Sequence, residues 1–376
     1  MPILAPAFYV ALCGLAALAI SQGIGRFAMT PILPMMQAEG LTLAQGGWLA
    51  AANYLGYLVG ALSTIWLALS PAAAIRGALL AIAVSTLAMG FVDSFAAWLA
   101  LRALAGVASG WVLVYVSAWA LERLADLGRP GLGGALYAGV GTGVAVAGFA
   151  CLVIMQLHSS ADAAWLSLGV AAIAATGAIW AAFGSAAPRT QASQSGSRVS
   201  SAWLLIACYG AYGFGYIVPA TFLPAMARQI VADPLAFGSA WPIFGTAAAL
   251  STLAAATLGA AMGPRRVWIV CMVIMAIGVA APLLVPGLAG ILLSALLVGA
   301  TFVTITLAGM QEARRLYGSA ARPVMAAMTS AFAVGQLIGP ILIALVETMP
   351  HGFTVVLLMA TASLLAGAAA LTSQHE

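Results

Sequence analysis

Two arginines, Arg26 and Arg102, lie inside long apolar stretches of the sequence. An ionised side chain is costly to bury among apolar groups unless it finds a polar partner or a cavity. A guanidinium stays charged at physiological pH, and its paired N–H groups fit carboxylate or phosphate oxygens. These two positions therefore indicate either the binding of an anion or a structural bond inside the protein.

Arg26 has a polar neighbour on its own helical face, because Gln22 precedes it by four residues. The surrounding stretch is rich in Gly and Pro, so we expect a partly unwound helix. We predict that Arg26 and Gln22 bind the acidic group of a solute. A structural alternative stays open, in which Arg26 caps carbonyl groups of the broken helix or stacks on an aromatic ring.

Three tyrosines, Tyr209, Tyr212 and Tyr216, follow a spacing of three and then four residues, which places them on one stripe of a helix. A buried phenol needs a hydrogen-bond partner, so this stripe is expected to form a wall of the solute site. The alternative is an aromatic belt at the edge of a membrane.

Further polar side chains interrupt other apolar stretches and are candidate solute contacts. Gln336 is a strong one, since an amide near the middle of such a stretch is costly to leave unpaired. Asn53 and Tyr57 share a helical face. The remaining candidates are Trp111, Tyr115, Thr301 and Thr304.

The composition places all of these residues in a membrane protein. Of 376 residues, 64% are hydrophobic and 6% are charged, whereas an ordinary soluble domain is roughly 25% charged. One span needs about 20 apolar residues, so the chain has room for about twelve. The net charge of +4 comes from arginines near span ends, and nucleic-acid binding is not its natural explanation.

Enzyme chemistry is not favoured, because no Asp, Glu or His lies near the middle of an expected span. A membrane-embedded enzyme would need a metal set, paired carboxylates or a nucleophile with its base. The four cysteines show no metal spacing and are expected to be packing residues. No metal or cofactor is predicted. The cysteines are Cys13, Cys151, Cys208 and Cys271.

Short polar breaks divide the chain into twelve expected spans around one central polar linker, residues 185–200. Residues 1–184 and 201–376 are thus predicted to form two six-helix bundles. The spans are expected at 6–36, 46–69, 76–92, 95–120, 132–157, 163–184, 202–230, 239–261, 267–286, 288–311, 322–346 and 353–371.

Arginine placement predicts the orientation, since loops on the cytoplasmic side of a membrane accumulate basic residues. With both termini cytoplasmic, ten arginines fall inside and only Arg228 falls outside. We therefore expect a multi-pass protein of a bacterial inner membrane with both termini in the cytoplasm.

The two halves repeat a pattern in the first and seventh spans. Residues Gly23, Gly25, Leu33, Pro34 and Met36 recur 190 positions later, at Gly213, Gly215, Leu223, Pro224 and Met226. Six spans separate the copies, so both have the same topology and the repeat is parallel.

These features resemble the major facilitator superfamily along the whole chain, and within it the bacterial branch labelled YbfB/YjiJ. The fourth span carries Arg102 followed by Gly106 and Gly110, and the glycine-rich stretches at Gly139 and Gly335 are similar to another family motif. The resemblance implies an all-α membrane protein with twelve transmembrane helices in two pseudo-symmetric six-helix bundles. It also implies a monomer whose spans 1, 4, 7 and 10 line a cavity, and a part for Arg102 in coupling; plain scaffolding by Arg102 is the alternative.

Acid-then-basic pairs after spans 4 and 10 resemble those that brace the cytoplasmic side of the family. They are Glu122 with Arg129, and Glu312 with Arg322. The family's hallmark loop after span 2 normally carries Asp-Arg, whereas here it contains only Arg76. The cytoplasmic latch is therefore expected to use Glu122 and Glu312 with nearby arginines.

The sequence thus predicts a membrane transporter for a small organic anion or zwitterion that works by alternating access. Efflux of amphipathic drugs or metabolites is the alternative, and a sensor that binds solute without moving it also remains open. With no carboxylate inside a span, facilitated diffusion or anion exchange fits better than carboxylate-mediated proton symport.

Overall fold

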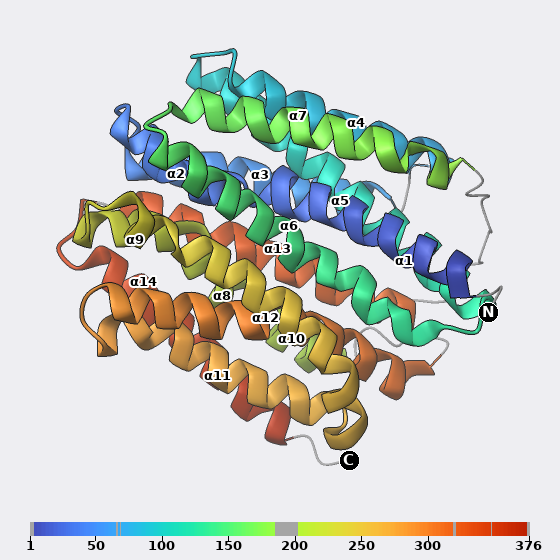
Figure 1. Ribbon diagram of the computed structural model, residues 1–376. Coiled ribbons are helices and arrows are strands. Elements are labelled where there is room, and N and C mark those ends of the chain that lie inside the picture. The colour runs from blue at the N-terminus through green and yellow to red at the C-terminus, as the bar shows by residue number, and fades with distance from the viewer. Residues whose placement is uncertain are drawn as a thin grey trace.

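The computed structural model describes residues 4–64, 67, 69–184, 202–318, 321–346 and 348–373. Over these residues the chain is built from helices that run side by side in one bundle (Figure 1). The start of α1 and the end of α14 lie at the same end of the bundle, which we call the terminal face. The other end, which holds α9 and the end of α2, is the opposite face.

The first half contains six membrane-length segments. The first of them is composite and changes from α-helix to π-helix and back. The elements are α1 (Leu4–Leu18), η1 (Ala19–Arg26), α2 (Met29–Ala38), α3 (Leu43–Ser63), α4 (Pro71–Met89), α5 (Phe95–Asp126), η2 (Pro130–Leu132), α6 (Gly133–Gln156), α7 (Ala161–Ile179) and η3 (Trp180–Phe183).

The second half repeats this order with one continuous helix in place of the composite segment. Its elements are α8 (Trp203–Ile230), α9 (Pro234–Gly238), α10 (Ala240–Met262), α11 (Pro264–Leu284), α12 (Leu288–Tyr317), α13 (Ala321–Val346) and α14 (Gly352–Ser373). The expected linker at 185–200 lies outside the described residues.

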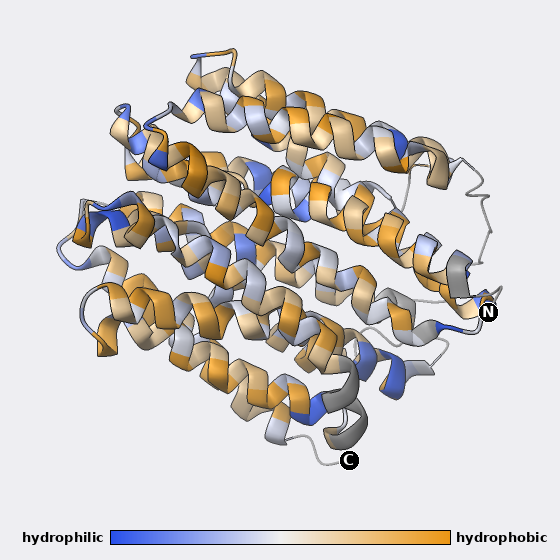
Figure 2. Cartoon of the chain, viewed as in Figure 1, coloured by the Kyte–Doolittle hydropathy of each residue, from blue (hydrophilic) through white to orange (hydrophobic). Residues whose placement is uncertain are grey.

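The membrane-spanning character of the helices is visible in their hydropathy. Hydrophobic residues cover most of the length of the helices, and hydrophilic residues gather at the two ends of the bundle (Figure 2). Ten helical segments of the described chain are long and apolar enough to cross a membrane. The helices α3 and α10 are not among these ten, and the glycines, Asn53 and tyrosines of α3 lower its hydropathy. Twelve long segments are therefore present, while the count of twelve spans stays a prediction.

Two helices are longer than the sequence pattern indicated. The helix α5 continues to Asp126 instead of ending near 120, because Leu124 extends its buried face. Likewise α12 continues to Tyr317 instead of ending near 311, and Glu312 is buried on it. Glu122 and Glu312 thus lie within helices, not after them.

Local sequence signals set the starts of several helices. Thr42 and Gln45 form a capping box at the start of α3, in which each side chain binds the other residue's backbone N–H. Ser70 and Ser160 cap α4 and α7 in the same position, and Pro71 occupies the first turn of α4. These caps fix where the chain re-enters the bundle.

Glycines bring α3 and α5 into backbone contact. A Cβ added at Gly106 would lie 2.0 Å from the carbonyl oxygen of Asn53, and one at Gly56 would lie 2.1 Å from that of Ala103. Only residues without a side chain allow this approach. The family-like spacing of Arg102 and Gly106 therefore places the Asn53 side chain beside the backbone of Arg102.

The two halves contact each other near the opposite face. Thr30 of α2 donates to the carbonyl of Ala220 on α8 at 3.0 Å, and the hydroxyls of Tyr54 and Thr221 lie 3.1 Å apart. A guanidinium N–H of Arg228 binds the carbonyl of Pro34. A cavity of about 460 Å³ opens beside these contacts between α2, α8, α13 and α14.

Candidate solute-binding site

Arg26 ends the π-helical turn η1, deep inside the protein. Its side chain is 3% exposed, and Nη1 donates to Oε1 of Gln22 at 3.0 Å. The guanidinium carbon lies 4.0 Å from the ring centre of Tyr57 and 4.9 Å from that of Phe27. The remaining donors, Nε and Nη2, are buried without a hydrogen-bond partner. The structure therefore joins Gln22, Arg26 and Tyr57 and leaves one edge of the guanidinium unused.

Gln22 is itself held in place by the neighbouring helix α5. Its Nε2 donates to Oγ of Ser21 at 3.2 Å and to the carbonyl of Ser109 at 3.3 Å. The Ser109 hydroxyl returns a bond to the carbonyl of Ser21 at 2.9 Å. These bonds turn the Gln22 oxygen toward Arg26 and fix which nitrogen of Arg26 is occupied.

The π-helical turn carries a free backbone carbonyl at Arg26. Pro31 has no N–H to donate to this carbonyl five residues back, and the N–H of Thr30 binds Phe27 instead. Arg102 supplies the missing donor, with Nη2 at 2.7 Å from the Arg26 carbonyl and Nη1 at 3.1 Å from that of Gly25. Arg102 thus binds the backbone that presents Arg26.

Asn53 joins the same node from α3. Its Nδ2 donates to the carbonyls of Gly25 at 3.1 Å and of Arg102 at 2.9 Å. We define Arg102 and Asn53 as the carbonyl clamp. Sequence reasoning placed Asn53 against a solute and Arg102 in coupling. In the structure the amide nitrogen of Asn53 and both Nη atoms of Arg102 bind backbone carbonyls.

Aromatic rings from both halves surround this site. Tyr216 stacks on Phe302 at 4.6 Å and on Phe332 at 5.6 Å, and Phe27 meets Phe302 at 5.9 Å between ring centres. Because Phe27 follows Arg26 directly, this cluster begins beside the guanidinium. The full set, which we call the central aromatic cluster, is Phe27, Tyr209, Tyr212, Tyr216, Trp241, Phe244, Trp268, Phe302 and Phe332.

The tyrosine stripe on α8 is at most 2% exposed and faces the interior, not the lipid. The hydroxyl of Tyr212 donates to the carbonyl of Phe302 at 2.7 Å, and the hydroxyl of Tyr216 accepts from Nε2 of Gln336. Tyr216 connects to Arg26 through rings, because it stacks on Phe302, which contacts Phe27, the residue after Arg26. Gln336 and the two tyrosines, all in the second half, thus lie in the aromatic surroundings that begin beside Arg26, and within the described residues no hydrogen bond joins them to its guanidinium.

Other candidates lie apart from this arrangement or bond to their own helix. Tyr115 follows Arg102 by 13 positions, which is roughly 20 Å along a helix, and its hydroxyl binds the carbonyl of Leu67. Trp111 binds the hydroxyl of Ser63. The hydroxyls of Thr301 and Thr304 bond to carbonyls one turn earlier in α12.

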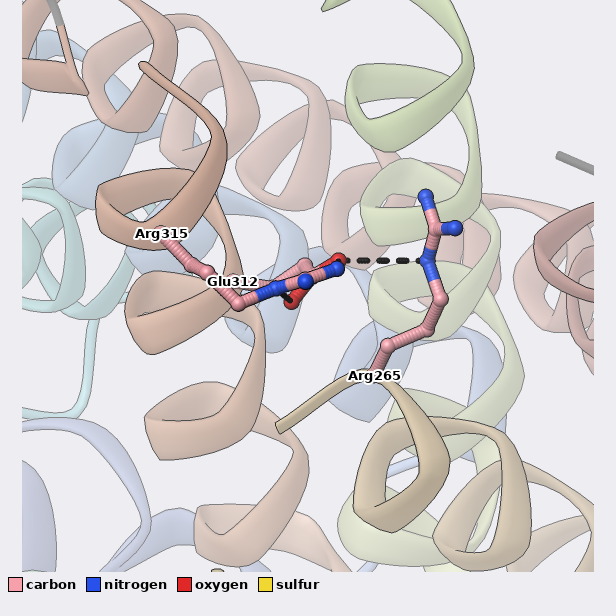
Figure 3. A network of polar contacts seen from close by, with 3 residues as sticks. All are labelled: Arg265, Glu312 and Arg315. Carbon is pink, nitrogen blue, oxygen red and sulfur yellow. Dashed lines mark hydrogen bonds and ion pairs between the residues drawn. The ribbon is translucent and has the colours of Figure 1, made fainter. Parts of the chain in front are cut away.

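The carboxylate of Glu312 forms a compact ionic network near the terminal face. It lies 3.1 Å from Nε of Arg265 and 2.8 Å from Nε of Arg315 (Figure 3). The sequence predicts Arg322 as the partner of Glu312, and the side chain of Arg322 lies outside the described residues. Glu122 and Arg129 are exposed on the N-terminal half. The network ties the start of α11 to the end of α12.

Sequence reasoning missed several residues of the site, namely Phe27, Tyr54, Ser109, Phe302 and Phe332. All but Ser109 are aromatic residues whose type is ordinary in an apolar helix. The spacing of Tyr54 and Tyr57 beside Asn53 was a usable signal, since it places three polar groups on nearby faces of α3. Within the described part of the chain, no three His, Cys, Asp or Glu side chains gather as a metal site would need.

The fold of long apolar helices in two repeated halves, with a charged site between them, defines a multi-pass membrane transporter. The family model described as "Uncharacterised MFS-type transporter YbfB" matches residues 18–372. The chain therefore belongs to the YbfB-type family of major facilitator superfamily transporters, and it is a transporter and not an enzyme.

Solved structures support the same fold. A crystal structure of the nucleoside transporter NupG matches with a TM-score of 0.72 at 15% identity, covering 100% of both chains. A point mutant of NupG matches with a TM-score of 0.71 at 16% identity, covering 98% of this chain and 100% of that one. No curated protein matches the sequence. At these identities the likeness concerns the fold alone.

Removing the carbonyl clamp should destabilise the protein. In Arg102→Leu the buried carbonyl of Arg26 loses its donor, at a cost of about 1–3 kcal/mol. Arg102→Lys restores one donor and should fall between Arg102→Leu and the wild type. Thermal unfolding of the purified protein in detergent measures the effect, with exposed Arg123→Leu on the same helix as the control. Wild-type melting of Arg102→Leu would contradict this role.

The Glu312 network should depend more on the buried carboxylate than on its exposed partner. Glu312→Gln removes both ion pairs and should cost on the order of 2 kcal/mol. Arg315→Gln should cost less than about 1 kcal/mol, because its side chain is 44% exposed. The same unfolding assay compares the two variants, and equal losses would show that burial does not set the strength of the network.

Proposed function

We propose that the protein transports a small organic anion whose carboxylate binds Arg26. The supporting observation is the pair of unpartnered donors, Nε and Nη2. These two nitrogens form one edge of the guanidinium, and their parallel N–H groups match the two oxygens of a carboxylate. Leaving buried donors unsatisfied is costly, so a bound carboxylate would remove that cost.

The charge balance of the interior supports the same proposal. Arg26 and Arg102 are 3% and 1% exposed, and no ion pair with an Asp or Glu reaches either of them in the described residues. Two uncompensated positive charges in a low-dielectric interior attract an anion strongly. Both the clamp and the cation–π contact with Tyr57 hold these charges without neutralising them.

The described form is closed around this site. The free edge of Arg26, Tyr212, Tyr216 and Gln336 are all buried. A solute would therefore enter after the halves separate or the aromatic side chains turn aside. We propose that alternating access provides this opening, with both termini in the cytoplasm of a bacterial cell and the opposite face outside.

The mode of coupling follows from the groups near the site. Within the described interior the site contains no carboxylate or histidine that could carry a proton in mid-membrane. Facilitated diffusion or anion exchange therefore fits better than carboxylate-mediated proton symport. A proton carried on the solute itself is the remaining route, and flux with and without a pH gradient distinguishes it.

Efflux of amphipathic compounds is a second candidate, favoured by the central aromatic cluster. Stacked rings bind flat apolar molecules without regard to charge. The two candidates differ in what Arg26 contributes. Anion transport needs the guanidinium edge, whereas efflux of uncharged or cationic compounds would proceed without it or against its charge.

Substitution of Arg26 should remove anion binding. Arg26→Lys keeps the charge and loses the two-pronged edge, so affinity should fall at least about 10-fold, and Arg26→Gln should abolish binding. Acetate, benzoate and succinate serve as probes in thermal-shift titrations and proteoliposome counterflow. Arg123→Gln controls for the loss of one exposed charge.

Two results would overturn the assignment. One is an anion-induced shift that survives unchanged in Arg26→Gln. The other is a response to uncharged or cationic amphiphiles alone, with no effect of any anion, which would favour efflux.

A further inference from the structure

The cationic edge that faces the site belongs to a single residue. Arg102 is equally buried, but its Nη1 and Nη2 bind the carbonyls of Gly25 and Arg26, so its one unpartnered nitrogen, Nε, offers no two-pronged edge. Nη1 of Arg26 is committed to Gln22. One edge remains, and it fits one carboxylate. A second negative charge on the solute would be buried without a partner, which is strongly unfavourable.

The surroundings of that edge are mostly apolar. Tyr57 covers one face of the guanidinium at 4.0 Å, and Phe27 and Phe302 lead from it into the central aromatic cluster. The hydroxyl of Tyr212 already donates to the carbonyl of Phe302, and the hydroxyl of Tyr216 accepts from Gln336 and keeps its own O–H as a donor. The part of a solute beyond its carboxylate would therefore contact rings, which favour an apolar or aromatic body.

No acidic side chain of the described site is free to pair with a positive group on the solute, and the unpartnered acceptors there, Oε1 of Gln336 and Oδ1 of Asn53, are neutral amide oxygens. The buried acid of the described chain is Glu312, which is already paired with Arg265 and Arg315 near the terminal face. Arg26 and Arg102 would repel an ammonium held nearby. Of the two solute classes that the sequence suggests, the zwitterion is thus the less suited.

We infer that the site selects a monocarboxylate with an apolar or aromatic body and no ammonium group. This inference rests on the proposed function, because it assumes that Arg26 binds the carboxylate. It specifies three properties of the solute, namely a single negative charge, an apolar body and no positively charged group.

A panel of matched probes tests each of these properties. The probe 3-phenylpropanoate carries one carboxylate on an apolar body. Phenylalanine adds an ammonium, 3-phenylpropanamide removes the charge, terephthalate adds a second carboxylate and acetate lacks the body. We expect 3-phenylpropanoate to bind at least about 10-fold more tightly than each of the others in thermal-shift titrations, since each change costs one matched interaction.

Two variants of the protein separate the possible outcomes. Arg26→Lys should lower the affinity for 3-phenylpropanoate and for acetate by a similar factor. Phe302→Ala should lower only the affinity for 3-phenylpropanoate, and so reduce the difference in affinity between the two probes. If anion binding requires Arg26 but terephthalate or phenylalanine binds more tightly than 3-phenylpropanoate, this inference is wrong and the proposed function stands. No dependence of any anion on Arg26 would overturn both. A melting curve without ligand confirms that each variant is folded.

A separate observation concerns the contact between the halves at the opposite face. Pro224 lacks an N–H, so the carbonyl of Ala220, four residues earlier on α8, has no helical donor. The hydroxyl of Thr30 in the other half fills this vacancy at 3.0 Å, and Thr30 is 2% exposed. A proline in one half thus creates an acceptor for a side chain of the other.

The sequence repeat explains the position of this bond. Thr30 and Ala220 are 190 residues apart, as are Pro34 and Pro224, so both pairs are equivalent in the two halves. Pro34 likewise removes the donor for the carbonyl of Thr30. Only Thr30 has a hydroxyl at this position, because alanine at 220 has no donor. The bond is therefore one-sided although the framework is repeated.

We propose that this bond, together with the contact of Tyr54 with Thr221, is a latch that holds the opposite face closed. The latch joins α2 and α3 of the first half to α8 of the second. Opening of that face requires both contacts to break. When the face opens, the carbonyl of Ala220 has no helical donor to return to and depends on water for a hydrogen bond.

Distances between spin labels at Gln37 and Gln229 measure this opening. These residues line the cavity at the opposite face from different halves. Thr30→Val keeps the shape and removes the donor, and should raise the population with separated labels about 2- to 10-fold. Pro224→Ala should act in the same direction, because it restores a helical donor that competes for the Ala220 carbonyl.

Thr30→Ser retains the hydroxyl and is the matched control, with the distance distribution of the wild type expected. An unchanged distribution in both Thr30→Val and Pro224→Ala would overturn the latch. So would an equal opening in Thr30→Ser. Because these readouts need no solute, their result is independent of the assignment of Arg26.

Discussion

The burial of a charged guanidinium with one edge unpartnered is the constraint on which the rest of the structure depends. Such a group persists only if the surrounding backbone is held firmly, since it would otherwise move toward water. The carbonyl clamp provides this support by binding the turn that carries Arg26, not the side chain itself. The charged side chain and the backbone that carries it are thus linked in one unit formed by η1, α3 and α5.

Small and irregular residues make that unit possible. Gly106 lets α3 approach α5, so that Asn53 reaches the carbonyl of Arg102 and also shares the carbonyl of Gly25 with the Arg102 side chain. The π-helical turn and Pro31 leave the carbonyl of Arg26 without a helical donor. In lipid such a group must be satisfied by protein. Backbone carbonyls are therefore the partners of the positive Arg102 side chain, in place of a negatively charged residue.

The sequence predicted the framework better than the contacts. The apolar pattern indicated the long helices, the spacing of 190 indicated the repeat, and the i,i+4 spacing brought Gln22 to Arg26. The roles of Arg102 and Asn53 were harder to foresee, because backbone carbonyls have no signature in a sequence. Phe302 and Phe332 were missed for a different reason: phenylalanine is common in apolar helices, and only the packing of α12 and α13 against α8 brings these two to Tyr216.

The repeat places different chemistry at equivalent positions of the two halves. Arg26 in the first half corresponds to Tyr216 in the second, and both are buried in the interior. One half thus contributes the charge and most of its supporting bonds, while the other contributes stacked rings and the amide of Gln336. The affinity for a solute would depend on the relative position of the halves, because one half would bind its carboxylate and the other half its apolar body. In the proposed function this division makes binding and the movement of the halves interdependent, with no titrating group required between them.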